Sequence, residues 1–146
     1  MNNQFYQLPL SFAGLMQKKD HRTCTLEQSI AQHLHLIITT AFGELAVDEN
    51  FGCCIWEYDF DNITSSHKIK EFIRESLSDA IIRYEKRLGN VRIELEIGQE
   101  ELASQKNGCR VKKKITITIT GWLNATNEKF IYEDAIFTGP LSYQLI

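Results

Sequence analysis

Apolar residues recur at helical spacing directly after Thr25. Gln28 follows three residues later, which is the spacing of a capping box, so the backbone N–H groups of the first turn have side-chain partners. The apolar positions then continue at intervals of three and four residues. The pattern predicts a helix over residues 26–40, and we expect Gly43 to end it.

A second stretch has the clearest helical period in the chain. Its apolar stripe follows Ser65 and Ser66, either of which can cap the helix, and it reaches Leu88. We therefore predict a helix that continues to Leu88. Gly89 fits the left-handed position that commonly follows a helix.

Alternating apolar and polar residues then predict three strands. They cover residues 91–97, 110–120 and 129–137, separated by a polar connection over residues 98–108 and a turn over residues 124–127. Short connections favour antiparallel pairing. Because helices precede strands, the predicted class is α+β, with two main helices packed on one face of a three- to four-stranded, mainly antiparallel sheet.

The remaining segments set the expected domain organisation. Residues 1–24 mix apolar and polar positions and form a predicted N-terminal arm, and residues 25–146 form a single predicted domain. The stretch over residues 43–62 is loop-like but rich in large apolar side chains, with a short strand possible near residues 53–58.

Charge distribution and cysteine spacing bear on the partners and the cellular location of the protein. Residues 23–67 contain no Lys or Arg, whereas basic residues predominate from Lys68 to Lys114, so one end could meet a basic partner or the halves could neutralise each other. The four cysteines lack CxxC spacing, which favours free thiols. No signal peptide or bilayer-length apolar run is visible, so we expect a cytoplasmic protein without direct membrane insertion.

Candidate chemistry is sparse along the chain. His33 and His35 would point about 200° apart on a helix, which disfavours a shared metal ion. Glu44 and Asp48 could serve as the two carboxylates of a glycoside hydrolase, although solvated loop charge is the simpler interpretation. The basic run at residues 112–114 is too narrow to indicate nucleic-acid binding. We predict no cofactor and no metal.

The junction between the second helix and the first strand carries the main candidate site. Glu85 and Arg87 fall in the last predicted helical turn, where the helix dipole favours Arg87 and disfavours Glu85. Residues two apart on a helix do not face each other. We therefore expect each charge to find its own partner.

The same junction resembles the GPW family of baseplate-wedge proteins from contractile phage tails, and most closely its type VI secretion counterpart, TssE. That family has Glu-Pro-Arg-Leu at a helix end before an alternating strand, and this chain has Glu85-Lys86-Arg87-Leu88 before residues 91–97. Upstream family features correspond to Ser29-Ile30, Gly43-Glu44 and Phe51-Gly52. Lys86 stands where the family has proline, which leaves the helix free to continue to Leu88.

The resemblance implies a structural, non-enzymatic baseplate role. It implies that Tyr84, Glu85, Lys86 and Arg87 contact TssF/TssG-like wedge subunits, and that a late strand edge meets sheath subunits and helps nucleate the sheath. The protein would sit in the cytoplasm at the base of a membrane-docked apparatus. Two alternatives stay open, an anti-adaptor-like binding module and a lysozyme-type hydrolase that uses Glu44 and Asp48.

Overall fold

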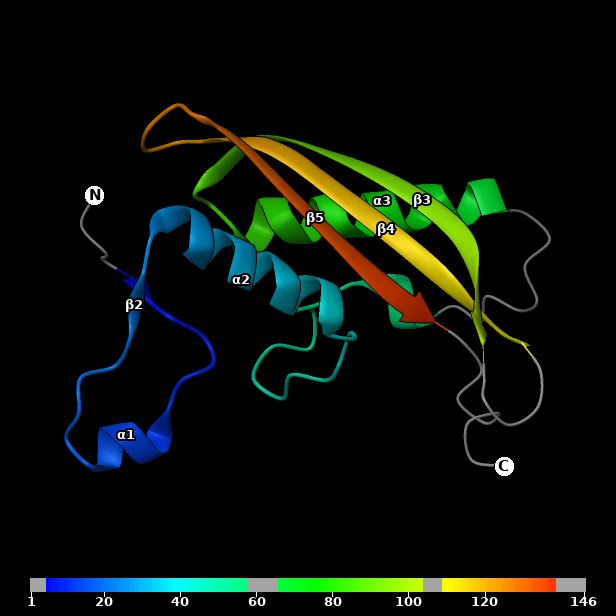
Figure 1. The fold of residues 1–146 in the computed structure, drawn as a ribbon. Helices are drawn as coiled ribbons and strands as arrows, with labels where there is room; N and C mark the ends of the chain where they lie inside the picture. Colours follow the sequence, from blue (N-terminus) through cyan, green and yellow to red (C-terminus); the bar gives the residue numbers. More distant parts are fainter. Residues whose placement is uncertain (1–4, 58–65, 104–108, 139–146) are drawn as a thin grey trace.

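The structure, a computed structural model, describes residues 5–57, 66–103 and 109–138 of the 146-residue chain. Figure 1 shows a long twisted sheet with two helices beneath it and a narrow arm at one side. The elements are β1 (Phe5–Tyr6), α1 (Phe12–Met16), β2 (Thr23–Cys24), α2 (Leu26–Thr39), the 3₁₀ helix η1 (Cys54–Glu57), α3 (Ser66–Tyr84), β3 (Leu88–Ala103), β4 (Cys109–Leu123) and β5 (Lys129–Thr138).

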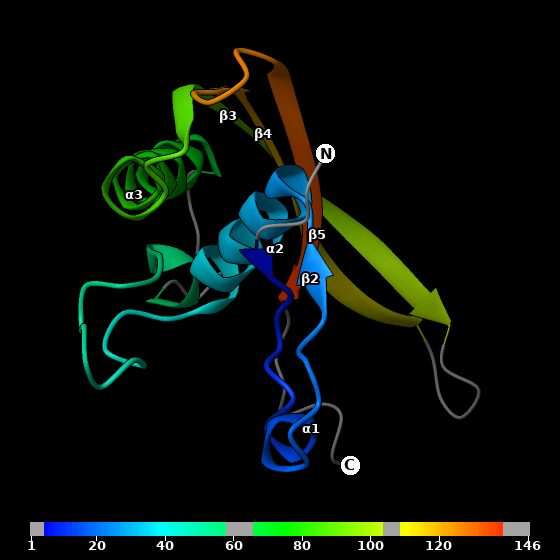
Figure 2. The same ribbon diagram turned by 90° about the vertical axis from the view of Figure 1, so that its left-hand side faces the viewer.

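The main sheet is an antiparallel meander in the order β3-β4-β5. Ile119 pairs with Ile93 on one side and with Tyr132 on the other, so the three strands share one register through the centre. Helices α2 and α3 lie on the same side of this sheet, as Figure 2 shows. The predicted α+β class is therefore confirmed, with three strands in the described main sheet and a separate two-stranded β1-β2 pair.

The core lies between the two helices and the inner sheet face. Ile115, Ile117 and Ile119 alternate along β4 and are fully buried, because every second residue of a strand faces the same side. Helix α2 contributes its predicted apolar stripe, with Ile30, Leu34, Ile37 and Ile38 buried. Each such side chain contributes about 1.5–3 kcal/mol on burial, so this layer holds the helices against the sheet.

Helix α2 begins where the sequence predicted but ends at a different residue. Thr25 and Gln28 form the complete capping box at its N-terminus. Its last residue is Thr39, and Thr40 is the C-cap in an extended conformation, so Gly43 does not end the helix. Gly43 instead has a φ of 81° within the following loop, where it accommodates a turn rather than a helix stop.

The loop after α2 is anchored by a close backbone approach. Cys53 donates its backbone N–H to the Thr40 carbonyl at 3.0 Å, and Ala41 forms an isolated parallel bridge with Cys53. Gly52 has a φ of 124°, and a Cβ there would clash with the Thr40 carbonyl. The short strand considered near residues 53–58 is a 3₁₀ helix over residues 54–57 instead, and residue 58 lies outside the described part.

The strands are longer than their apolar patterns indicated. β3 continues through Ala103, so the predicted polar connection is strand from residue 98 to 103, and residues 104–108 lie outside the described part. Long twisted β3 and β4 pair along nearly their whole length, and a register shift lies between Gly89 and Arg92. Backbone pairing with β4 therefore extends the strand beyond the alternating apolar residues.

The N-terminal arm is a narrow hairpin that carries α1 at its far end. Phe5 pairs with Cys24 and Tyr6 with Thr23 in its two-stranded base. The base is fixed to α2, because the Leu8 backbone N–H donates to the Gln32 side chain at 2.8 Å.

Cys24, Cys53 and Cys54 are all buried free thiols, and burial raises the pKa of Cys53 to about 12.

Candidate functional site

Helix α3 and strand β3 meet in a tight turn over residues 84–88, which we call the corner. Tyr84 is the last helical residue, and the backbone N–H of Glu85 still donates to the Ile81 carbonyl at 2.8 Å. Residues 86 and 87 form a turn, and β3 begins at Leu88. The prediction of a helix up to Leu88 is therefore wrong, and Glu85 and Arg87 do not lie in a helical turn.

Asn124, from the turn between β4 and β5, fixes the backbone of the corner. Its side-chain amide donates to the Lys86 carbonyl at 2.8 Å, and its backbone N–H donates to the Arg87 carbonyl at 2.9 Å. A Cβ on Gly89 would lie 2.7 Å from the Asn124 Oδ1, so glycine permits this close approach. The left-handed residue is Asn90, with a φ of 49°, rather than Gly89.

Glu85 and Arg87 form an internal ion pair. Arg87 Nε donates to Glu85 Oε1 and Arg87 Nη2 donates to Glu85 Oε2, both at 2.8 Å. The Arg87 backbone N–H adds a bond of 3.2 Å to Oε1. The expectation that each charge finds a separate partner is therefore wrong. The rule for residues two apart applies within a helix, and the helix has already ended here.

The pair also joins the corner to α2 and to the arm. His33 Nδ1 lies 2.7 Å from Glu85 Oε2, and Arg87 Nη1 donates to the Ser29 hydroxyl at 2.9 Å. The Arg87 guanidinium lies over the Phe5 ring, 5.2 Å from its centroid. Three segments that are far apart in the sequence are thus held by one carboxylate and one guanidinium.

Electrostatics keep both members of the pair charged. Burial would raise the pKa of Glu85, but hydrogen bonds from Arg87 and His33 and the charge of Arg87 outweigh it and lower this pKa to about 2. The hydrogen bonds with Glu85 in turn raise the pKa of Arg87. A buried carboxylate that is this fully paired is a structural element, and it is not available as a general acid.

Tyr84 connects the corner to the loop after α2. Its hydroxyl donates to Asp48 Oδ2 at 2.8 Å, and this bond raises the pKa of the Tyr84 hydroxyl. The Tyr84 ring packs edge-to-face on Phe51 at 5.0 Å between centroids, and Phe51 stacks on His33 at 6.1 Å. Tyr84 therefore holds the loop after α2 against the corner, and Arg87 of the ion pair contacts the arm at Phe5.

Exposure separates the four predicted site residues. The Glu85 side chain is 1% exposed, so it cannot contact a partner in this conformation. Lys86 is exposed, the Arg87 side chain is 31% exposed, and Tyr84 is half-buried. The structure thus brings all four residues together at one corner, but it leaves three of them reachable from outside.

Glu44 and Asp48 both accept hydrogen bonds within their own part of the fold. Glu44 Oε2 accepts from the Ala41 backbone N–H at 2.8 Å. Asp48 accepts from Tyr84 through one oxygen and from the Asn50 backbone N–H at 3.0 Å through the other. These contacts assign the two carboxylates to loop geometry, and neither is held in a hydrophobic pocket of the kind that prepares a catalytic acid.

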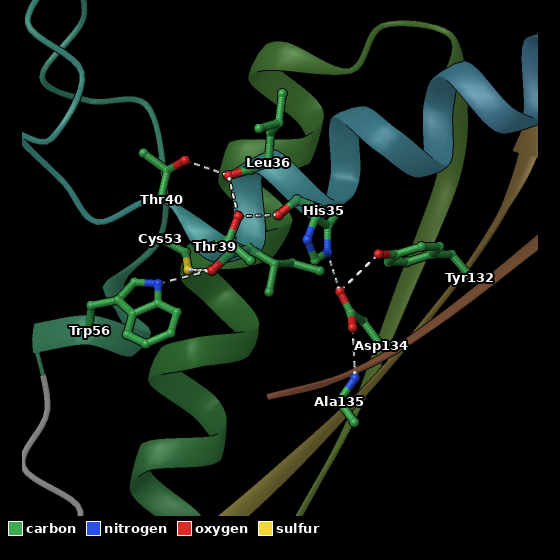
Figure 3. Close-up of polar contacts among 10 residues, drawn as sticks. His35, Leu36, Thr39, Thr40, Cys53, Trp56, Tyr132, Asp134 and Ala135 are labelled. Atoms are coloured by element: carbon green, nitrogen blue, oxygen red, sulfur yellow. Dashed lines mark hydrogen bonds and ion pairs between the residues drawn. The ribbon is translucent and has the colours of Figure 1, made fainter. Parts of the chain in front are cut away.

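A second polar cluster links α2 to the edge of the sheet. His35 Nδ1 lies 2.7 Å from Asp134 Oδ2, and the Tyr132 hydroxyl donates to the same oxygen at 2.8 Å, as Figure 3 shows. Burial and the bond to Asp134 raise the pKa of Tyr132. His33 and His35 therefore serve different partners, consistent with their predicted divergence. Sequence reasoning missed this cluster. The signal that could have indicated it is Asp134, an acidic residue at an inward-facing position of β5.

Strand β5 forms one edge of the main sheet, and among the described residues no strand pairs along its outer side. Its side chains alternate between inner positions such as Phe130 and Ile136 and exposed positions such as Ile131. Also within the described ranges, no three His, Cys, Asp or Glu side chains are grouped closely enough to hold a metal ion.

Comparison with known proteins identifies one family. The model of the family described as baseplate wedge protein gp25 matches residues 24–128, which include α2, the corner and the first two strands of the main sheet. No curated protein matches the chain significantly. None of the helices in the described ranges has the length and apolar character of a membrane span.

Two solved structures share this fold. A candidate tail lysozyme from Geobacter sulfurreducens is 23% identical, with a TM-score of 0.58, and the match covers 84% of this chain and 99% of that one. A chain in the baseplate complex from the type VI secretion system is 14% identical, with a TM-score of 0.51, and the match covers 77% of this chain and 93% of that one. At these identities the similarity establishes the fold alone.

Proposed function

Because the chain belongs to the family of baseplate wedge protein gp25, a structural baseplate component, we propose that it is a TssE-like subunit of a type VI secretion system or a related contractile machine. In this role it links the wedge to the first sheath ring and helps nucleate sheath assembly. The observation that carries the proposal is the family match over residues 24–128. The shared fold with a chain of the type VI baseplate complex supports the choice of machine.

The corner is the proposed contact with TssF/TssG-like wedge subunits. Lys86 and the exposed part of Arg87 present positive charge beside the half-buried Tyr84. Glu85 acts from within, because its two bonds to Arg87 set the direction in which the guanidinium points. A partner that offers carboxylates or carbonyl oxygens would complete the exposed donors of the guanidinium.

The outer edge of β5 is the proposed contact with a sheath subunit. A terminal strand presents unpaired backbone N–H and C=O groups, and an incoming strand of a partner can pair with them. β5 runs from Lys129 to Thr138, which is long enough for a partner strand of ordinary length. Strand addition along β5 would couple this domain to the sheath through the backbone, with little dependence on side-chain identity.

The proposed role is non-enzymatic. One neighbour of the same fold is a candidate tail lysozyme. The carboxylates that the sequence offered for such an activity are Glu44 and Asp48. Both already accept hydrogen bonds from the loop and from Tyr84. Peptidoglycan turnover by the purified chain that disappears in Glu44→Gln would contradict the non-enzymatic role.

We also propose the setting in which the subunit acts. It would be cytoplasmic, at the base of a membrane-docked apparatus, with residues 1–24 as an arm and residues 25–146 as the baseplate domain. Fractionation of cells that produce the apparatus tests the location. Recovery of the subunit with the baseplate fraction is the expected result.

Charge reversal at Lys86 tests the wedge contact most directly. Lys86→Glu changes an exposed side chain, so the isolated domain should keep its unfolding midpoint, whereas co-purification with the wedge subunits should fall. The matched control is Lys68→Glu, an exposed lysine on α3 away from the corner. If Lys86→Glu binds the wedge subunits as well as the wild type does, the corner is not part of the interface.

A further inference from the structure

The N-terminal arm is an addition to the family domain. The family match begins at residue 24, where the second strand of the arm ends. Both ribbon views place α1 at the far end of the arm, away from the sheet and from α2 (Figures 1 and 2). None of the residues of α1 is buried, so this helix does not contribute to the hydrophobic core.

The tip of the arm nevertheless has a defined conformation. The Ser11 hydroxyl accepts from the Gly14 backbone N–H at 3.4 Å at the start of α1. At the other end, Lys19 donates its backbone N–H to the Gly14 carbonyl at 3.0 Å, and Lys18 has a φ of 59°. This is the bonding of a helix stop with a left-handed residue, so the tip is ordered by its own caps.

The ordered tip exposes a compact apolar face. Phe12, Leu15 and Met16 occupy positions i, i+3 and i+4 of α1, which lie on one side of a helical turn. Their exposed fractions are 70%, 45% and 86%. Water-exposed apolar side chains held in a fixed arrangement lose little conformational entropy when a partner covers them.

Basic residues follow this apolar helix in the sequence. Lys18, Lys19 and Arg22 follow α1, and Asp20 is the single acidic residue of the arm. The rest of the neighbouring sequence has the opposite character, because residues 23–67 contain no Lys or Arg. The arm therefore carries the positive charge at this end of the chain, and a partner that covers the tip gains from carboxylates at its rim.

The base of the arm rests on the corner. The Phe5 ring lies under the Arg87 guanidinium at 5.2 Å, and Leu8 is bonded to Gln32 of α2. The arm thus starts beside the residues assigned above to the wedge contact. A wedge subunit bound at the corner is in reach of the element that leaves from it.

We propose that the arm tip docks into an apolar groove rimmed by carboxylates on the wedge subunit bound at the corner. Phe12, Leu15 and Met16 fill the groove, and Lys18 and Lys19 pair with its rim. This inference rests on the proposed function and names a second point of attachment to the same partner. A bilayer is the less suitable occupant, because membrane surfaces are bound by larger basic clusters and Asp20 opposes anionic lipid.

The test uses the full chain and the wedge subunits of its own apparatus, immobilised as the co-purified TssF/TssG-like complex. Phe12→Ala/Met16→Ala removes the apolar face, and Lys18→Gln/Lys19→Gln removes the adjacent charge. Val47→Ala is the matched control, because Val47 is 89% exposed on the body of the domain. Affinity is measured by biolayer interferometry over a series of salt concentrations, and unfolding midpoints confirm that each variant is folded.

The expected result is a loss of about tenfold or more in affinity for the apolar double variant, the size found when central apolar anchors are truncated. The lysine variant should bind more weakly at low salt and show a flatter salt dependence. Val47→Ala should bind as the wild type does. Together these results would establish the tip as a binding element.

Two kinds of outcome would overturn the inference. If both tip variants bind with wild-type affinity while Lys86→Glu still binds weakly, the arm tip is not a binding element and the proposed function stands. Failure of the wild-type chain to bind the wedge subunits overturns both. Tip-dependent self-association in sedimentation velocity, or tip-dependent flotation with phosphatidylglycerol vesicles, would also overturn the inference if wedge binding is unchanged.

Discussion

Arg87 holds both carboxylate oxygens of Glu85 at 2.8 Å, although a single residue separates the two in the sequence. The geometry is possible because α3 has ended at Tyr84, so the chain turns and brings the two side chains together. The remaining guanidinium nitrogen reaches Ser29 on α2. The charge pair is thus part of the fold first, and any contact with a partner uses what it leaves exposed.

Neutralising Glu85 should destabilise the isolated domain. Glu85→Gln leaves the Arg87 charge without its counterion at a site where the carboxylate is 1% exposed, so we expect a loss of about 2 kcal/mol or more in the free energy of unfolding. Urea denaturation measures it. Glu71→Gln is the control, because the Glu71–Arg74 pair is 43% exposed on both sides and should contribute less than about 0.5 kcal/mol.

The same carboxylate should make stability depend on acid. The pKa of Glu85 is lowered from its ordinary 4.5 to about 2, so the unfolded chain takes up this proton first as the pH falls. The stabilisation is present above about pH 4.5 and is lost progressively toward about pH 2. The difference in unfolding free energy between wild type and Glu85→Gln should therefore be smaller at about pH 3 than at about pH 6, with the decrease falling below about pH 4.5. A difference that stays constant over this range would contradict the assignment.

Two glycines of the loop after α2 should respond differently to alanine. Gly52→Ala combines a left-handed φ of 124° with a clash against the Thr40 carbonyl, so we expect a loss of about 3 kcal/mol. Gly43→Ala has a φ of 81° but open space around the added Cβ, so the loss should be about 1 kcal/mol. Thermal unfolding of the two variants compares them, and equal losses would mean that the backbone approach at Thr40 is not rigid.

The cluster around Asp134 should contribute a modest amount of stability. Asp134→Ala removes the acceptor of both His35 and Tyr132, and because the His35 side chain is 56% exposed we expect a total loss of about 1 kcal/mol. A double-mutant cycle with Tyr132→Phe should show coupling, since the two changes remove the same hydrogen bond. Additive losses would mean that the Tyr132 hydroxyl has another partner.

Proline substitutions along β5 should separate folding from sheath assembly. Proline at alternate positions from Lys129 to Phe137 removes N–H groups on one side of the strand at a time. Where the lost N–H faces β4, stability falls; where it faces the outer edge, the domain stays folded and sheath nucleation is blocked. Electron microscopy of assembled sheaths provides the measurement. Normal sheaths in every folded variant would exclude strand addition at this edge.

Local signals in the sequence predicted the main elements. The capping box at Thr25 and Gln28 placed the start of α2 correctly, and the alternation through Ile115, Ile117 and Ile119 placed β4 in the core. These features depend on residues within a few positions of one another. The same holds for the α+β class, which follows from the order of the elements.

The contacts that shape the corner could not be read in the same way. The apolar stripe of α3 continues to Leu88, so local periodicity extended the helix past its end at Tyr84. What ends it is tertiary, because Asn124, the first residue after β4, holds the turn through two hydrogen bonds. The partners of Glu85 and Arg87 on α2 are equally remote, and no short-range pattern announces them.

The long-range bonds at the corner also depend on complete folding of the domain. His33 and Glu85 are 52 residues apart in the sequence, and Ser29 and Arg87 are 58 apart. These two bonds can form only after α2 has packed against the corner, so the Glu85–Arg87 pair is bonded to His33 and Ser29 only in a chain whose long-range contacts are in place. If a wedge subunit binds the corner as proposed and requires Arg87 to be bonded to Ser29, it would bind completely folded copies in preference to incompletely folded ones.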